Sequence, residues 1–431
     1  MGHGGAAHRG EEHVVELNDR SAVRKITRML LDRVDGADLL IGIPCYNNGG
    51  TVGAVVENAA VGLAQYFPEL RGCILVADGG STVDDSREEA LAAIQRTEAH
   101  GVVGIYRGLS GKGSAVRMIF EAGAALGVKA LALLDADLRS ATPLWIERLL
   151  CPVVHEDYEF VAPLYNRYKF DGTITNNVTY NMLRCLYGKR VRQPIGGEFA
   201  LSGDLAQILR AQPVWESDVA RFGVDIWLTI QALMRGARIC QTRLGVKVHD
   251  AKDPASSLEP MFRQVVGTLF TLMEETDACW MSIVGSDVIP SFGEPVEEEP
   301  EAFPIDFEKL VENFFVSWET LKGAWRGILS ADTYAELEIH AATGRAAFDL
   351  PTDLWVRILF EFAATFHHRS TARRQVIEVL SPLYFARVAS FINRTRELSN
   401  AEAEAVVEEQ ARVFELRKPD LVDLWKDAAP V

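Results

Sequence analysis

Short apolar runs alternate with segments of helical spacing over the first two thirds of the chain. Apolar runs of about four to eight residues are typical of buried strands. Such runs cover residues 39–44, 73–77, 102–106, 130–134, 160–164, 199–201 and 239–248. Helical spacing covers residues 21–34, 51–66, 86–98, 113–126, 175–187, 225–235 and 258–276. Strands joined by helices predict an α/β fold with a mostly parallel sheet.

The organisation of the chain changes near residue 290. Residues 286–304 are rich in Pro and Glu, which predicts a linker or an extended arm. Residues 305–431 have helical periodicity, and we expect a helical C-terminal domain that packs as a bundle. Residues 21–285 would form the α/β domain, after a disordered tail at residues 1–20. A length of 431 residues agrees with two domains.

The acidic balance of the chain narrows its partners. The formal net charge is −16 at pH 7, which disfavours a nucleic-acid-binding surface because phosphate contacts need basic residues. The six cysteines form no C-x-x-C pair, and several lie in apolar runs, as buried thiols of a reducing compartment do. The N-terminus lacks an apolar signal segment, and no run of about 18 apolar residues is evident. We therefore expect a cytoplasmic protein without a transmembrane segment.

Two carboxylates follow the apolar run at residues 130–134. Asp135 and Asp137 would stand at the carboxyl end of a buried strand, where parallel sheets bind their ligands. Mg²⁺ and Mn²⁺ prefer oxygen ligands of this kind and bridge substrate phosphates. The pair is therefore a candidate for holding the diphosphate of a nucleotide-sugar donor, although Asp-x-Asp pairs are common in proteins.

Other polar segments follow the neighbouring strands. Asn47 and Asp78 also fall at strand ends, and Asp78 can accept hydrogen bonds from a nucleobase or a ribose hydroxyl. A helix cap at Ser81 or Thr82 is an alternative for that segment. Lys112 stands between two glycines at the start of a predicted helix, where free N–H groups and the helix dipole suit an anion.

The pattern differs from those of two other classes of nucleotide-binding protein. The chain lacks the P-loop spacing, and it lacks G-x-G-x-x-G after the first strand, which disfavours ATP hydrolysis by that route and a dinucleotide cofactor. His249 ends the predicted strand at residues 239–248. A ring nitrogen there could complete a metal site, although a lone His is more often structural.

The order of these segments resembles GT-A-fold glycosyltransferases of the family-2-like type. Along the chain it reads P-x-Y-N-N, D-G-G-S-T-x-D-D, G-K-G and D-A-D. The middle of the chain looks like mannosylglycerate synthases and, more loosely, glucosyl-3-phosphoglycerate synthases. The runs that carry this similarity are residues 165–167, 171–175, 193–198, 222–225 and 247–249. The resemblance covers residues 38–275 and implies a Rossmann-like nucleotide-sugar-binding sheet with a helical C-terminal extension.

The resemblance implies a metal-dependent, retaining hexosyltransferase. Its donor would be GDP-mannose or UDP- or GDP-glucose, and its cofactor Mg²⁺ or Mn²⁺. Its acceptor would be a small hydroxy acid such as D-glycerate, as in the synthesis of mannosylglycerate, a compatible solute. The metal ligands would be Asp137 and His249. The nucleotide-binding positions would be Pro44, Tyr46, Asn48, Asp78, Lys112 and Asp135.

The resemblance also implies an acceptor site and catalytic positions. Arg167 and Thr175 would hold the acceptor carboxylate, for which an Arg fork is chemically suited. Glu198 would contact the donor sugar, and Asp225 would orient hydroxyl groups. Where phosphoglycerate-using relatives carry a basic G-R-x-T, residues 172–175 read G-T-I-T, so the sequence leaves a phosphorylated acceptor in question.

Several alternatives remain open at this stage. An inverting path would use Asp225 or Glu198 as a base, whereas the lack of an obvious covalent nucleophile favours front-face attack with retention. The acceptor could instead be a saccharide, a lipid or phosphoglycerate. An inactive nucleotide-sugar-binding scaffold is disfavoured by the intact Asp pair, Lys112 and His249. Apolar stripes in the C-terminal helices predict core packing or a homo-oligomer.

Overall fold

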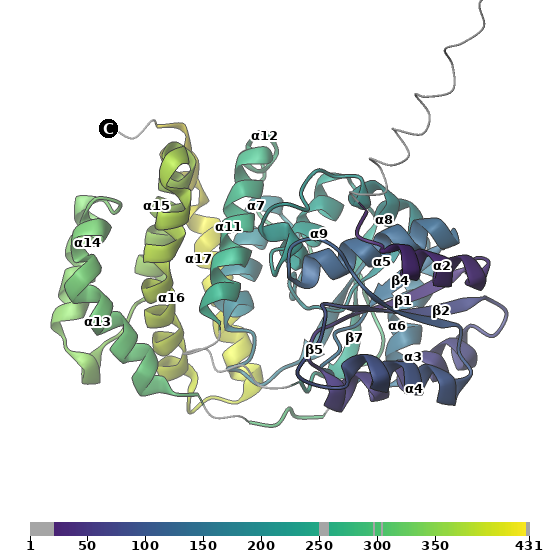
Figure 1. Cartoon of the computed structure of the whole chain (residues 1–431). Coiled ribbons are helices and arrows are strands. Elements are labelled where there is room, and N and C mark those ends of the chain that lie inside the picture. Colours follow the sequence, from purple (N-terminus) through teal and green to yellow (C-terminus); the bar gives the residue numbers. More distant parts are fainter. Residues whose placement is uncertain (1–20, 250–257, 296–297, 303–304, 428–431) are drawn as a thin grey trace, which may run out of the picture. The chain divides into compact units, whose positions relative to one another are not determined.

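The computed structural model describes residues 21–249, 258–295, 298–302 and 305–427. Its contacts divide the chain into two compact units (Figure 1). The first is Met1–Leu150 with Ala200–Arg221, and the second is Cys151–Phe199 with Phe222–Val431. This division differs from the predicted one, because the predicted α/β domain at residues 21–285 contains parts of both units. The predicted domain boundaries stay a prediction. The predicted tail at residues 1–20 lies outside the described residues.

The first unit is built around a mostly parallel sheet with the strand order β3-β2-β1-β4-β6. The strands are β1 (Leu39–Cys45), β2 (Gly72–Asp78), β3 (Gly101–Ile105), β4 (Ala130–Leu133) and β6 (Ala200–Ser202). Strands β1 to β4 are mutually parallel, and β6 runs antiparallel to β4. β1 is buried along nearly its whole length, as expected for a parallel strand covered on both faces.

Helices cover both faces of this sheet. The helices of the first unit are α2 (Lys25–Val34), α3 (Gly49–Tyr66), α4 (Ser86–Thr97), α5 (Lys112–Leu126), α8 (Gly203–Arg210) and the short η2 (Asp218–Ala220). α3 and α4 lie on one face, and α2, α5 and α8 lie on the other (Figure 1). α6 (Pro143–His155) continues past the boundary of the unit. The carboxyl ends of β1, β2 and β4 therefore meet along one edge.

The second unit combines a short parallel sheet with many helices. β5 (Phe160–Asn166), β7 (Ile239–Val246) and β8 (Ser291–Phe292) are parallel, with a register shift after Leu164. The π-helix η1 (Thr175–Thr179) continues into α7 (Tyr180–Tyr187), where a single helix is predicted. β8 belongs to the segment predicted as a linker, so part of that segment is a strand of the unit.

The remaining helices of the second unit pack mainly against one another. They are α9 (Val224–Met234), α11 (Glu259–Glu275), α12 (Asp277–Trp280), α13 (Phe307–Arg326), α14 (Ala331–Ala342), η3 (Arg345–Ala347), α15 (Thr352–His368), η4 (Ser370–Ala372), α16 (Arg373–Thr395) and α17 (Asn400–Lys426). α17 packs on α7 and α15, and α16 packs on α11 and α13. The predicted apolar stripes are core: Leu354, Ile358 and Phe362 are fully buried. The α/β fold with a mostly parallel sheet and a helical C-terminal region is confirmed.

One described helical segment, residues 370–395, is long and apolar enough to span a membrane by length and composition. Its mean hydropathy is 1.2, and 78% of its apolar window is buried inside the molecule. The core helix of a globular unit has the same properties. The sequence-based expectation overlooked this segment because polar residues such as Ser381 and Arg387 interrupt it; both are buried.

Candidate active site

Asp78 organises the turn that follows β2. It pairs in register with Cys45 at the end of β1 and is fully buried. Its carboxylate accepts hydrogen bonds from the N–H groups of Gly80 at 2.9 Å and Ser81 at 3.0 Å, and from the Ser81 hydroxyl at 2.6 Å. The alternative of a helix cap at Ser81 is wrong, because that hydroxyl serves Asp78 and α4 begins only at Ser86.

A polar loop joins β1 to α3 and is fastened to the turn after β2. The Asn48 side chain accepts a hydrogen bond from the Tyr46 N–H at 3.0 Å, and the Asn48 N–H donates to the Ser86 hydroxyl at 2.7 Å. The Tyr46 side chain is 57% exposed, and Pro44 lies just before it in β1. An exposed ring on a fixed loop offers a surface on which a nucleobase can stack.

Asp84 fastens the same two segments. Its carboxylate accepts from the Ser86 hydroxyl at 2.6 Å and from the N–H of Gly49, the first residue of α3, at 2.8 Å. The Ser86 hydrogen bond, helped by that of Gly49, holds the pKa of Asp84 below its ordinary value. The loops around Asn48 and Asp78 are thus positioned by hydrogen bonds within the first unit.

Two predicted nucleotide-binding residues form an ion pair. Lys112 Nζ lies 2.7 Å from Asp135 Oδ1, with side chains 12% and 25% exposed. Lys112 opens α5, and Asp135 follows β4. The loop after Asp135 is also held, because the Thr51 hydroxyl donates to the backbone oxygen of Ala136 at 2.7 Å. The structure therefore brings a cation and a carboxylate together at the carboxyl edge of the sheet.

The glycines beside Lys112 have a packing role. The Gly113 N–H donates to the Arg221 backbone oxygen at 3.1 Å, and the Gly111 N–H donates to the Tyr106 hydroxyl at 3.0 Å. A Cβ at Gly113 would stand 1.8 Å from the Val219 oxygen, a distance that only glycine can accommodate. The expectation of free N–H groups at both glycines is therefore wrong, and Lys112 itself remains the anion-binding candidate of this segment.

Asp137 is suited to a divalent cation. It is partly buried, and its carboxylate makes no hydrogen bond or ion pair with any residue that the structure describes. Hard cations favour such carboxylate oxygens and take further ligands from water and substrate phosphates. Within the described ranges, no three His, Cys, Asp or Glu side chains gather in one potential metal cluster. The donor set of the first unit thus fits a cation held by few protein ligands.

Glu198 lies in a buried network of the second unit. Its carboxylate is fully buried and accepts hydrogen bonds from the Tyr165 hydroxyl and from Lys247 Nζ, which is 2.8 Å from Oε2. Lys247 also donates to the Gly196 backbone oxygen at 2.9 Å. Lys247 therefore neutralises Glu198. The contact of Glu198 with a donor sugar stays a prediction.

Asp171 links two predicted site residues. Its Oδ2 lies 3.5 Å from a terminal nitrogen of Arg167 and 3.5 Å from His249 Nε2. Burial raises the pKa of Asp171, but the charge of Arg167 and the hydrogen bond of His249 outweigh it, and the pKa lies well below its ordinary value. Gly172 next to it has a φ of +66°, which favours glycine. The role of His249 as a metal ligand stays a prediction.

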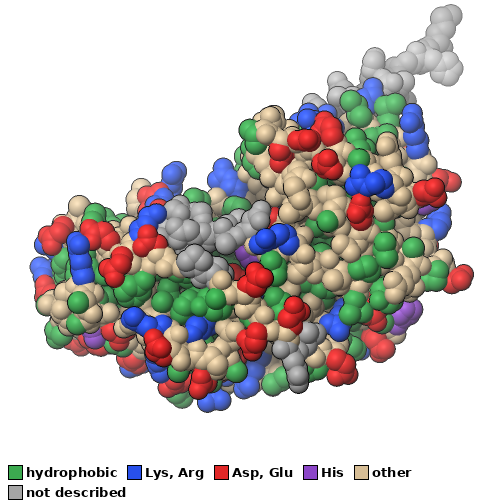
Figure 2. Space-filling model, turned by 90° about the horizontal axis from the view of Figure 1, so that it is seen from below, with side chains coloured by type: hydrophobic (Ala, Val, Ile, Leu, Met, Phe, Trp, Pro, Cys, Tyr) green, Lys and Arg blue, Asp and Glu red, His purple; other side chains and the backbone are tan. Residues whose placement is uncertain are grey.

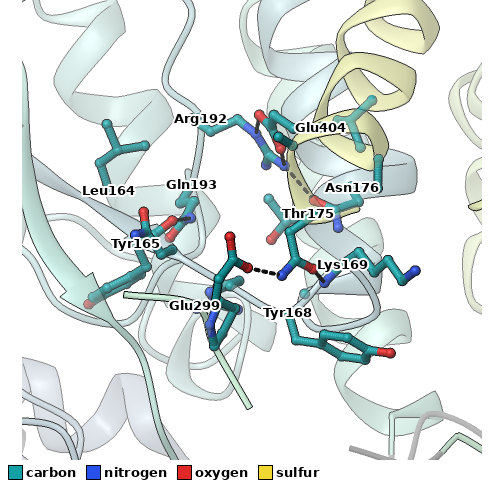
Figure 3. A pocket seen from close by; sticks show the side chains of 18 of the residues that line it. Leu164, Tyr165, Tyr168, Lys169, Thr175, Asn176, Arg192, Gln193, Glu299 and Glu404 are labelled. Carbon is teal, nitrogen blue, oxygen red and sulfur yellow. Dashed lines mark hydrogen bonds and ion pairs between the residues drawn. The ribbon is translucent and has the colours of Figure 1, made fainter. Parts of the chain in front are cut away.

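A cavity of about 370 Å³ lies at the end of β5, within the second unit (Figure 3). Arg167 and Thr175, the two residues predicted to hold the acceptor, both line it. The π-helix η1, the chain at residues 298–300 and the first turns of α17 supply further walls. The structure thus gathers the predicted acceptor residues around one cavity.

The walls of the cavity are strongly polar. Arg192 forms a two-pronged ion pair with Glu404, at 2.6 and 2.7 Å, and donates to the Asn176 side chain at 2.8 Å (Figure 3). Gln193 is only 4% exposed. Among the described residues, its Oε1 has no hydrogen-bond partner, and neither has the buried Nε of Arg167. Two residues of the lining thus carry a buried polar atom without a described partner, one an acceptor and one a donor.

The C-terminal helices hold the π-helix that begins at Thr175. Trp355 of α15 donates from Nε1 to the Asn177 backbone oxygen at 2.9 Å, and Gln410 of α17 donates from Nε2 to the Asn176 oxygen at 2.7 Å. π-helical turns often occur at functional sites, and their carbonyls need partners outside the usual helical pattern. Here those partners come from the region predicted as a separate helical domain.

Asp225, the other predicted catalytic position, also belongs to the second unit. It lies in the first turn of α9 and is 8% exposed. A carboxylate at this position is favoured by the helix dipole, which gives it a structural reason to be there. Its predicted role in orienting hydroxyl groups stays a prediction.

Sequence reasoning assigned no role to several polar residues of the site. These are Tyr165, Asp171, Arg192, Gln193 and Glu404. Tyr165, Asp171 and Gln193 lie within the runs that carry the family resemblance, and this position was a signal that they belong to the site. Glu404 lies in α17, far along the chain, and no local pattern marks it.

Charges of both signs are interspersed over the face shown in Figure 2. Lys and Arg side chains alternate there with Asp and Glu, and the described residues on this face form no continuous basic stripe. This mixture agrees with a net charge of −16.

The family comparison concerns a stretch of the chain that includes parts of both units. Residues 40–210 match the family described as glycosyl transferase family 2. This stretch contains β1 to β6 and the strand-end residues Asn48, Asp78, Lys112, Asp135 and Asp137. The chain thus carries a family 2 glycosyltransferase domain of GT-A type, and the predictions of a glycosyltransferase and of its family are confirmed.

Solved structures of the glucosyl-3-phosphoglycerate synthase from Mycobacterium tuberculosis are similar to this chain. The complex with Mg²⁺ and uridine diphosphate is 25% identical, and the match covers 56% of this chain and 82% of that one, with a TM-score of 0.44. The complex with Mn²⁺, UDP-glucose and phosphoglyceric acid is 26% identical over the same shares, also with a TM-score of 0.44. Among curated proteins, none matches the chain.

Proposed function

We propose that the protein is a metal-dependent, retaining glycosyltransferase that moves a hexose from a nucleotide-diphosphate sugar to a small hydroxy acid such as D-glycerate. The observation that carries the proposal is the placement of Asp78 at the end of β2 and of the Lys112–Asp135 ion pair just after β4, inside the family 2 domain; β2 and β4 are parallel strands on either side of β1. Open α/β sheets bind their ligands at this edge.

The first unit supplies the donor site. Asp78 is rigidly held by its turn, so an approaching base or ribose would meet fixed polar groups rather than a mobile loop. Tyr46 offers an exposed ring beside it. The Lys112 ammonium group would contact the donor diphosphate, either in place of Asp135 or together with it. A fixed cation at this position stabilises the charge of the leaving group.

Asp137 and His249 are the residues that would hold a divalent cation. A bound Mg²⁺ or Mn²⁺ would neutralise the charge that develops on the departing diphosphate. Asp137 suits this role because its carboxylate makes no contact with another described side chain. His249 would have to share Nε2 with Asp171, which lies 3.5 Å away, or use its other ring nitrogen.

The cavity of the second unit is the proposed acceptor site. Arg167 would hold the acceptor carboxylate through its guanidinium, whose Nε has no partner within the described residues. Asp171 keeps the guanidinium oriented from the other side. Thr175 would hydrogen-bond the acid, and Gln193 Oε1 would accept from an acceptor hydroxyl.

Retention is favoured by the state of the candidate bases. Glu198 is fully buried and ion-paired with Lys247, so proton abstraction by this carboxylate would have to compete with that pair. Front-face attack would let a leaving diphosphate oxygen take the acceptor proton. NMR of the product anomer distinguishes the paths: a β-linked product from an α-linked donor would exclude retention.

A screen of substrates tests the proposal directly. The full-length protein is incubated with GDP-mannose, GDP-glucose or UDP-glucose, with Mg²⁺ or Mn²⁺, and with D-glycerate, related hydroxy acids or simple sugars. We expect transfer to a hydroxy acid and slow donor hydrolysis in its absence. Absence of both transfer and hydrolysis for every donor would reject the enzyme in favour of a nucleotide-sugar-binding scaffold.

A further inference from the structure

We propose that Glu299 and Glu404 make the cavity selective for singly charged hydroxy acids and against phosphorylated ones. The inference rests on the proposed function, because it concerns the cavity in which Arg167 and Thr175 would hold the acceptor. Neither glutamate belongs to the family 2 domain, since that domain covers residues 40–210. The selectivity would therefore come from the arm after β8 and from α17.

The cavity offers a hydroxy acid what it needs. Arg167 Nε is an unsatisfied buried donor, and Gln193 Oε1 is an unsatisfied buried acceptor, counted over the described residues. A hydroxy acid has a carboxylate to accept from the first and a hydroxyl to donate to the second. A volume of about 370 Å³ is roughly twelve water molecules at about 30 Å³ each, which leaves room for a small acid and several waters.

The basic residues of the cavity are already engaged. Arg167 is paired with Asp171, and Arg192 is held by both carboxylate oxygens of Glu404. Lys169 Nζ donates to backbone oxygens at the end of α16, among them that of Thr395 at 2.9 Å. A fourth cation of the lining, Arg243, donates to the Gly293 backbone oxygen at 3.2 Å. Arg167 and Arg192 therefore balance charges of the protein itself, Lys169 and Arg243 hold backbone oxygens, and a phosphate would have to compete with these partners.

Glu299 adds a negative charge at the rim. Its carboxylate accepts a hydrogen bond from the Asn400 side chain at 2.6 Å, and Asn400 in turn accepts from the Lys169 N–H at 3.0 Å (Figure 3). Among the described residues, Glu299 pairs with no cation. The carboxylate is thus fixed by a neutral partner and lines the cavity, and no cation of the described ranges forms an ion pair with it.

A phosphorylated acid would meet this charge at close range. A phosphate adds a charge of about −1.5 to −2 at neutral pH, and like charges brought together at a binding site are strongly disfavoured. An unphosphorylated hydroxy acid brings one negative charge, which the Arg167 guanidinium can take. The cavity should therefore distinguish D-glycerate from 3-phospho-D-glycerate, which differ only in the phosphate.

Direct binding of these two acids tests the inference without any donor. Affinities are measured by titration calorimetry or saturation-transfer NMR with the full-length protein, at matched ionic strength, because exposed charges are screened by salt. We expect the wild type to bind D-glycerate at least about tenfold more tightly than 3-phospho-D-glycerate. Glu299→Gln, which keeps the hydrogen bond to Asn400, should reduce that preference about fivefold or more, as should Glu404→Gln, which frees Arg192.

Two variants serve as controls of charge alone. Glu301→Gln removes the same charge two residues beyond Glu299, and Glu409→Gln removes it from an exposed position of α17; neither residue lines the cavity. Both should keep the wild-type preference. The inference is overturned if the wild type binds 3-phospho-D-glycerate as tightly as D-glycerate, if it binds neither acid, or if Glu299→Gln changes the preference no more than Glu301→Gln.

The result separates this inference from the proposed function. Selective binding of D-glycerate without transfer from any donor would reject the glycosyltransferase activity and leave the selectivity standing. Transfer of a hexose with no discrimination against the phosphorylated acid would support the glycosyltransferase activity and reject the selectivity.

Discussion

Gln410 reaches across the chain to Asn176, to whose backbone oxygen it donates a 2.7 Å hydrogen bond. The same carboxamide accepts from the buried Arg387, which also donates to the Leu350 oxygen at 2.7 Å. Burial lowers the pKa of Arg387 to about 10, so it is charged at neutral pH. A charged, fully hydrogen-bonded group in the helical region thus supports the π-helix of the proposed acceptor site.

Removing the Gln410 side chain should disturb that π-helix. Gln410→Ala removes one of the two side-chain hydrogen bonds of the Asn176 carbonyl, which Asn181 also contacts, and leaves the buried Nε of Arg387 without its partner. A buried unsatisfied group costs about 1–3 kcal/mol. Urea unfolding should show a loss of that size. In the proposed reaction, the KM for the acceptor should rise while the KM for the nucleotide sugar stays the same, because the predicted nucleotide-binding residues lie in the other unit.

A comparable change on the surface provides the control. Gln95→Ala alters an exposed position of α4 and should leave stability and both KM values unchanged. Equal increases in the two KM values for Gln410→Ala would show that the substitution disturbs the protein as a whole, and the link between α17 and the acceptor site would be rejected.

The fold was largely predictable because its core strands are continuous apolar runs. β1, with Leu39 to Ile41 fully buried, could hardly be anything but a central strand, and the polar residues that follow such strands mark the ligand edge. The candidates at Asp78, Lys112 and Asp135 follow from that rule together with the family motifs. Their local geometry, such as the hydrogen bonds of Ser81 to Asp78, depends on turn conformation that periodicity does not encode.

The arrangement of the second unit was much less predictable. Glu299 and Glu404 line the same cavity as Arg167, although more than 130 residues separate them from it along the chain. A Pro- and Glu-rich stretch is typical of a linker, and an amphipathic helix indicates only that one face is buried. Neither pattern specifies which part of the fold the segment packs against. The pairing of Lys247 with Glu198 was hidden for the same reason, because it depends on tertiary contact.

The buried pair of Lys247 and Glu198 should be sensitive to the loss of one partner. Their side chains are 5% and 0% exposed, and removing one member of a buried ion pair typically costs about 3–5 kcal/mol because the other charge is left unpaired. Lys247→Met should therefore lower the free energy of unfolding by roughly that amount. The double variant with Glu198→Gln should recover much of it. The exposed pair of Lys189 with Asp287 supplies the comparison: Lys189→Met should cost only about 0–1 kcal/mol.

Recovery in the double variant is the decisive observation. If Glu198→Gln fails to compensate Lys247→Met, the cost arises from packing of the lysine stem rather than from the uncompensated carboxylate. The charge-neutralising role of Lys247 would then be incorrect.

Lys112 should contribute to nucleotide binding. Calorimetric titration with UDP or GDP in the presence of Mn²⁺ should give an affinity about tenfold or more weaker for Lys112→Met than for the wild type, because one charge-assisted contact to phosphate contributes about 1.5–3 kcal/mol. Lys129→Met is a suitable control, since Lys129 is a largely exposed lysine paired with Asp38. Unchanged nucleotide affinity in Lys112→Met would remove this lysine from the donor site.

Chelation tests the divalent cation. EDTA should abolish hexose transfer, and addition of excess Mn²⁺ or Mg²⁺ should restore it. Asp137→Asn should weaken Mn²⁺ binding to the nucleotide complex, measured by electron paramagnetic resonance, because a carboxylate is a stronger ligand for hard cations than an amide. Full activity in EDTA would mean that the reaction proceeds without the metal. Lys112, which pairs with Asp135, would then be the cation of the first unit that stabilises the leaving diphosphate.

Acid should weaken the contact between Glu404 and Arg192. Burial raises the pKa of Glu404, but the charge and hydrogen bonds of Arg192 outweigh it, so its pKa in the folded protein lies below the ordinary value of 4.5. A lowered pKa means that the folded state favours the ionised form. The corresponding stability is present above about pH 4.5 and is lost as the pH falls through the folded value.

The difference in free energy of unfolding between the wild type and Glu404→Gln should therefore be largest at pH 5–7 and shrink below about pH 4.5. Urea unfolding at several pH values measures it, with Glu409→Gln as the exposed control on the same helix. A difference that stays constant down to pH 3 would show that Arg192 does not stabilise the ionised carboxylate.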